Sequence, residues 1–144
     1  MMEVFSPYII AAVVGWVVAQ GLKAIIQSIK GRNINNLRQL YLSGGMPSAH
    51  SATVLAVTTV IGFKDGFGSA VFGLAFLVVL IVTYDAMMVR RSSGEQGASL
   101  TALIKEQKSK VRLPRVAKGH TPFEVLAGVV VGVLVGIAVS FLTI

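Results

Sequence analysis

Four apolar runs constrain the fold of this chain more than any other feature. A helix needs roughly 17 to 25 apolar residues to cross about 30 Å of hydrocarbon. We place the runs at approximately residues 7–28, 47–63, 67–89 and 122–144. Hydrophobic residues make up 54% of the 144, and the mean hydropathy is +0.77, which lies far outside the range of a soluble protein. We therefore expect an all-α fold, a single membrane domain over residues 1–144 with four transmembrane helices.

The distribution of basic residues predicts the orientation in the membrane. The connections at 29–46 and 90–121 hold most of the lysine and arginine, whereas the connection between the second and third runs has only Lys64 beside Asp65. By the positive-inside rule both basic connections are cytoplasmic and both termini lie outside. The net charge of +7 then favours membrane lipid head groups and phosphate esters. A nucleic-acid partner is not expected, because topology already accounts for these charges.

The connection at 90–121 also carries a helical pattern. Ser99 has the residue type of an N-cap, and Leu100, Leu103, Ile104 and Val111 follow it at helix-like spacing. We expect a short interfacial helix, which either rests on the head groups or covers a site as a lid.

Small residues mark one face of the last apolar run. Gly128, Gly132 and Gly136 recur one turn apart, which lets another helix approach closely. The first run has a looser counterpart in Ala11, Gly15 and Ala19. The pattern leaves open whether these faces meet within one chain or form a homodimer.

Both histidines of the chain stand at the start of an apolar run. They belong to Met46-Pro47-Ser48-Ala49-His50 and to Gly119-His120-Thr121-Pro122. The first-turn amides and the dipole of a helix favour an anion at such a position. Asp85, Arg90 and Arg91 end the third run at the same predicted membrane level. Two imidazoles, clustered guanidinium groups and two helix N-termini suit phosphoryl transfer, with one histidine attacking and the other protonating the leaving oxygen.

These motifs resemble, in order along nearly the whole chain, those of the divergent type 2 phosphatidic acid phosphatase family, small membrane proteins related to acid phosphatases and vanadium haloperoxidases. The matching segments are Gly44 to Ala52, Tyr84-Asp85-Ala86, Val89-Arg90-Arg91, Gly94-Glu95-Gln96, Gly119 to Pro122, Glu124-Val125 and Gly128. The resemblance implies that His120 is the nucleophile and becomes phosphorylated, that His50 is the general acid, and that the Ser48 hydroxyl binds phosphate. It also implies that Glu124 orients His120 and that no metal or cofactor is required.

The chain departs from the wider superfamily in its phosphate ligands. Ala49 replaces a glycine of the histidine motif, and the arginine expected six residues before the nucleophile falls on Pro114. The remaining candidates for binding phosphate are the nearby basic residues Arg90, Arg91, Arg115, Lys23 and Arg38, with Arg112 also close in sequence. Asp85 is a functional candidate because ionisable groups are costly at membrane depth.

Several simpler interpretations remain open. Thr121 and Glu124 match a capping box, Ser48 and Ser51 suit a helix cap, and Asp85 can pair with a neighbouring arginine. Arg90 and Arg91 can also serve only to end the third span. The function expected is hydrolysis of a lipid or isoprenoid phosphate or pyrophosphate at the cytoplasmic face. The alternatives are a lipid-phosphate carrier or flippase, a structural or regulatory subunit, and a divalent-metal site built from Asp85, Glu124 and the histidines.

Overall fold

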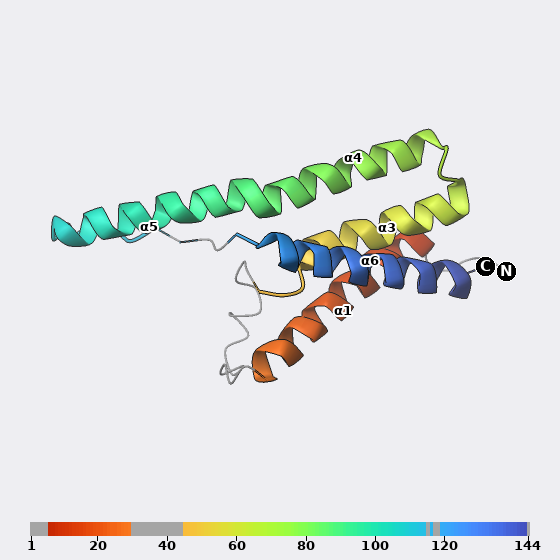
Figure 1. Ribbon diagram of the computed structural model, residues 1–144, viewed down its shortest axis with the longest axis horizontal. Coiled ribbons are helices and arrows are strands. Elements are labelled where there is room, and N and C mark those ends of the chain that lie inside the picture. The colour runs from red at the N-terminus through yellow and green to blue at the C-terminus, as the bar shows by residue number, and fades with distance from the viewer. Residues whose placement is uncertain (1–5, 30–44, 115, 117–118, 144) are drawn as a thin grey trace.

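The structure is a computed structural model that describes residues 6–29, 45–114, 116 and 119–143. All regular structure in these residues is helical, which confirms the expected all-α class (Figure 1). The elements are α1 (Pro7–Ile29), α3 (Ala49–Asp65), α4 (Ala70–Tyr84), the π-helical turn η1 (Asp85–Val89), α5 (Arg90–Glu106) and α6 (Pro122–Leu142).

Helix α3 is the centre of the bundle, since α1, α4 and α6 all pack against it. Its buried face consists largely of small residues, among them Ala49, Ser51, Ala52 and Ala56. Small side chains let neighbouring helix backbones approach closely, which is the usual way to pack helices where lipid removes the hydrophobic driving force.

The glycine stripe of α6 faces α3 of the same chain. A Cβ atom on Gly128 would lie 2.5 Å from the Ser48 carbonyl oxygen, and one on Gly136 would lie 2.5 Å from the Thr59 Cβ. Gly15 of α1 faces α3 as well, where its Cβ would meet the Ala56 Cβ at 3.0 Å. The face formed by Gly128, Gly132 and Gly136 is therefore covered within the protomer, and a homodimer would need another surface.

Successive helices run in alternating directions, so four helix ends share one end of the bundle. At the end of the bundle away from the two histidines, the Tyr8 hydroxyl of α1 donates to Asp65 Oδ2 at 2.7 Å, and Lys64 Nζ donates to the Thr143 carbonyl at 2.6 Å. At the end that carries the two histidines, the Ser48 backbone N–H donates to the Glu124 carbonyl at 3.0 Å. The starts of α3 and α6 thus lie together, each beginning close to one of the two histidine motifs.

Three of the described helices are long and apolar enough to cross a membrane, judged by length and composition. They are Pro7–Ile29, the continuous helix Ala70–Glu106, and Pro122–Leu142. The predicted span at 47–63 corresponds to α3, which has 17 residues and a length of about 25 Å. Because that length falls short of the hydrocarbon core, the fourth span stays a prediction.

The helix that carries the third predicted span does not end at Val89. α4 continues through η1 into α5 as one helix that extends away from the rest of the bundle (Figure 1). The expected separate interfacial helix beginning at Ser99 is therefore wrong. Ser99 lies inside α5, where its hydroxyl donates to the Glu95 carbonyl one turn earlier instead of capping a new helix. α5 ends at Glu106, so Val111 lies beyond it.

Candidate functional site

A π turn anchors the second histidine motif. In η1 the Arg90 backbone N–H donates to the Asp85 carbonyl, five residues earlier, instead of to Ala86. The Ala86 carbonyl accepts instead from the backbone N–H of His120, at 2.9 Å. Insertions of this kind are frequent at functional sites because they release a main-chain group from the helical ladder. Here the released carbonyl fixes the start of the α6 motif against the end of α4.

The His120 ring is buried and is held by Glu124. The ring Nδ1 donates to Glu124 Oε2 at 3.2 Å, and His120 is 5% exposed. The same Oε2 accepts from the Thr121 N–H at 3.1 Å, while the Thr121 hydroxyl accepts from the Glu124 N–H at 3.3 Å. Glu124 is thus both a member of a capping box and the partner of His120, so the two interpretations of this residue hold together.

Burial and Glu124 act in opposite directions on His120. Desolvation lowers the pKa of His120 below its ordinary value, while the hydrogen bond and charge of Glu124 raise it, and burial has the larger effect. The ring is therefore neutral near pH 7. When Nδ1 carries the proton toward a carboxylate, Nε2 is left with a free lone pair.

His50 comes from a different helix. It lies in the first turn of α3 and is exposed. The charges of Arg90, His120 and Asp85 all act on it, as does that of Lys23. The structure thus brings the two imidazoles together at one end of the bundle, in electrostatic range of each other.

The two adjacent arginines differ in position. Arg90 Nε lies 2.7 Å from Asp85 Oδ2, and its positive charge acts on both histidines. Arg91 Nε instead pairs with Glu95 along α5 at 3.2 Å, and both of these side chains are well exposed. Only Arg90 belongs to the cluster around the histidines.

Of the predicted phosphate ligands that the structure describes, Lys23 and Ser48 are the most buried. Lys23 near the end of α1 is 5% exposed, and its charge acts on Glu124 and on both histidines. The Ser48 side chain is fully buried and caps α3, since its Oγ accepts from the Ser51 N–H at 3.4 Å and from the Ser51 hydroxyl at 3.0 Å. The structure supports the capping interpretation for Ser48.

Two of the predicted phosphate ligands, Arg38 and Arg115, lie outside the described residues. Arg112 is described and exposed in the segment after α5. Within the described part of the chain, no three histidine, aspartate or glutamate side chains are grouped in a way that could hold a metal ion.

Gly119 and the Ala86 carbonyl are positioning elements that the sequence did not reveal. A Cβ on Gly119 would lie 2.5 Å from the Arg91 backbone nitrogen, so the segment before His120 runs directly against the start of α5. A glycine immediately before the second histidine motif is the signal that could have indicated this close approach.

Comparison with known proteins shows the family of this chain. A model of the divergent PAP2 family matches residues 5–135, which covers most of the chain. This chain belongs to the divergent PAP2 family. The relationship predicted from the motifs is thereby confirmed.

A relative matches nearly the whole chain. It is named "Uncharacterized membrane protein YuiD", from Bacillus subtilis (strain 168), and is 28% identical over 156 residues, covering 97% of this chain and 98% of the relative. No solved structure matches. Together with the three long apolar helices, this relative supports a multi-pass membrane protein.

Proposed function

We propose that this divergent PAP2 protein is a membrane phosphatase that hydrolyses a lipid or isoprenoid phosphate through a phosphohistidine on His120. The observation that carries the proposal is the pairing of His120 with Glu124 in electrostatic range of His50. A buried, neutral imidazole oriented by a carboxylate is a nucleophile, and a second imidazole beside it can serve as an acid.

In the first step, Nε2 of His120 attacks phosphorus and the bond to the ester oxygen breaks. His50 donates a proton to the departing oxygen, so that an alcohol leaves. In the second step, water attacks the phosphohistidine and loses a proton to His50. The phosphorus–nitrogen bond then breaks and inorganic phosphate is released, which restores both histidines.

Arg90 and Lys23 supply the fixed positive charge of the proposed site. Their charges act on both histidines, so a phosphate between the rings lies in their field. Stabilising charge on the phosphoryl oxygens is usually the largest single contribution to this kind of catalysis. Asp85 pairs with Arg90 and acts as a positioning residue. The positive-inside rule supports a cytoplasmic location of the basic connections, and we therefore propose that the site faces the cytoplasm.

The test is phosphate release by purified protein from a panel of polyprenyl and glycerolipid phosphates. His120→Ala should abolish both release and covalent labelling of the protein by radioactive substrate phosphate. Lys105→Ala, which removes an exposed charge on α5, is the matched control and should retain activity. Covalent labelling that persists in His120→Ala would rule out the assigned nucleophile.

His50 is tested by the choice of leaving group. A leaving group that is stable as an anion, such as the p-nitrophenolate of p-nitrophenyl phosphate, needs no proton. His50→Ala should therefore lose phosphorylation by lipid phosphates but still give a burst of p-nitrophenolate, about one per protein molecule, because only the second step, which uses His50 as the base, is slowed for this substrate. A lipid-phosphate carrier would bind and move its lipid while releasing no phosphate from any substrate.

A further inference from the structure

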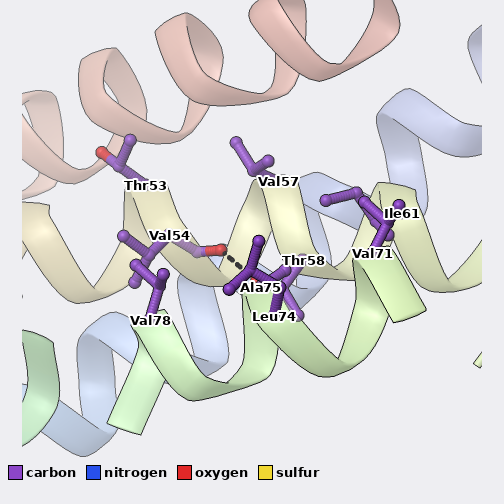
Figure 2. A pocket seen from close by; sticks show the side chains of 9 residues that line it. All are labelled: Thr53, Val54, Val57, Thr58, Ile61, Val71, Leu74, Ala75 and Val78. Carbon is purple, nitrogen blue, oxygen red and sulfur yellow. Dashed lines mark hydrogen bonds between the residues drawn. The ribbon is translucent and has the colours of Figure 1, made fainter. Parts of the chain in front are cut away.

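An apolar groove of about 310 Å³ runs between α3 and α4 (Figure 2). Its walls consist mainly of aliphatic side chains from these two helices, namely Val54, Val57, Ile61, Val71, Leu74 and Val78. This volume lies at the lower end of the range for small-molecule sites in proteins. The groove is suited to hydrocarbon and to nothing charged.

The two threonines of the groove do not make it polar. Thr53 donates its hydroxyl to the Ala49 carbonyl at 2.9 Å, and Thr58 donates to the Val54 carbonyl at 2.8 Å. Both hydroxyls are therefore satisfied by the helix that carries them. Neither requires water or a polar ligand in the groove.

The groove is aligned with the proposed phosphate site. On α3, Val54, Val57 and Ile61 follow His50 at four, seven and eleven residues, so all four lie on one helix face. Val54 is about 6 Å along the helix axis from His50. The α3 side of the groove thus begins one turn from the proposed general acid.

The α4 wall of the groove also runs toward the proposed phosphate site. Val71, Leu74 and Val78 share a face with Asp85, which follows Val78 by seven residues, or about 10 Å. In Figure 2, Val54 and Val78 lie together at one end of the groove, while Ile61 and Val71 lie together at the other. Because the charge of Asp85 acts on His50, both walls lead toward the site from the Val54 and Val78 end.

We infer that this groove holds the first part of the hydrocarbon tail of the phosphorylated lipid whose phosphate binds between His50 and His120. The inference rests on the proposed function and adds its substrate class, an amphiphile with a phosphate head group and with its tail packed between α3 and α4. Cationic groups lie beyond the Val54 and Val78 end of the groove, and the groove itself is apolar. This arrangement matches a molecule with an anionic head and a hydrocarbon tail. Along Val54 to Ile61 the groove is about 10 Å long, so the tail beyond that length enters the bilayer.

The binding test uses His120→Ala protein, so that no turnover is needed. Polyprenyl monophosphate and phosphatidic acid, each with a photoactivatable diazirine in the tail, are crosslinked to the protein in nanodiscs. We expect crosslinks at residues 53–61 and 71–78 that an unlabelled lipid phosphate suppresses and the same tail without phosphate does not. Equal suppression by the tail without phosphate would indicate ordinary membrane lipid, and crosslinks to a second copy would indicate a dimer contact. Either result would overturn the inference.

The activity test fills the groove. Ala75→Phe places a ring in it, whereas Leu77→Phe adds a ring on the outer face of α4 and is the matched control. We expect Ala75→Phe to lower kcat/KM for the long-tailed substrate about ten-fold, which is the scale of a changed apolar pocket, and to leave p-nitrophenyl phosphate hydrolysis unchanged.

The outcomes separate this inference from the proposed function. If wild type cleaves neither substrate, the proposed function fails and the crosslinking result alone decides the groove. If wild type is active but Ala75→Phe affects both substrates equally, the proposed function stands and the groove assignment is wrong.

Discussion

Arg90 Nε lies 2.7 Å from Asp85 Oδ2, and the two residues are five positions apart. The π turn that separates them also turns the Ala86 carbonyl toward the backbone of His120. One irregularity in a long helix therefore joins the ion pair, the second histidine motif and the end of α4.

The ion pair predicts different roles for two neighbouring arginines. Arg90→Ala should lower kcat/KM about 100-fold, because it removes a charge that acts at the phosphate. Arg91→Ala should change kcat/KM by less than about three-fold, because this side chain pairs with Glu95 and both are well exposed. Steady-state kinetics on the two purified variants provides the comparison. Equal losses would mean that the position of Arg90 has no special importance.

Two substitutions of Glu124 can separate its role in capping α6 from its role in orienting His120. Glu124→Gln retains an oxygen that can accept from Thr121 but loses the negative charge, so the melting temperature should change little while kcat falls at least about ten-fold. Glu124→Ala should lose the cap as well, at a cost of about 1 kcal/mol in the free energy of unfolding. Full activity in Glu124→Gln would show that this residue serves the helix alone.

The pKa of His120 predicts the acid side of the pH profile. Because burial lowers this pKa, the nucleophile stays neutral down to a pH below about 6.5, and activity should fall only as the pH drops through that lowered value. Glu124 raises the pKa of His120, so Glu124→Gln should move this acid limb to still lower pH. The measurement is kcat/KM for p-nitrophenyl phosphate against pH in both proteins. An acid limb that moves to higher pH in the variant would contradict this assignment.

The packing of α6 on α3 predicts a steric effect on stability. In Gly128→Ala the new Cβ would meet the Ser48 carbonyl oxygen at 2.5 Å, and the backbone there cannot move without disturbing the cap of α3. We expect a loss of about 1 to 3 kcal/mol in the free energy of unfolding.

Gly73→Ala is the matched control for this steric effect, because a Cβ at Gly73 has nothing within 4 Å. Alanine should stabilise that helix by up to about 1 kcal/mol. Thermal unfolding in detergent distinguishes the two variants. Equal stability in Gly128→Ala and wild type would mean that α6 can move away from α3.

The sequence predicted much of this arrangement from residue type and position. The apolar runs indicated the helices, and the two histidine motifs indicated two helix starts that the structure places side by side. The alternating direction of the helices then brings those ends together. Such inferences succeed because they depend on local composition and on the geometry of a bilayer.

The remaining features depend on tertiary contacts that no local pattern encodes. Asp85 to Val89 has no glycine or proline to mark a π turn, and the turn is supported by His120, more than thirty residues later. Ser99 has the residue type that begins a new helix, yet α5 continues from α4 through this position without a break. Serine at position 48 suits a phosphate ligand and a cap equally well, and only its burial favours the cap.

The unbroken helix from Ala70 to Glu106 is about 55 Å long, nearly twice the thickness of the hydrocarbon core. Its polar half projects about 24 Å beyond Arg90, with no flexible joint between them. The ion pair between Asp85 and Arg90 therefore lies where the apolar part of this helix meets its polar part. A change in the tilt of the polar part would reach these two residues before the rest of the bundle.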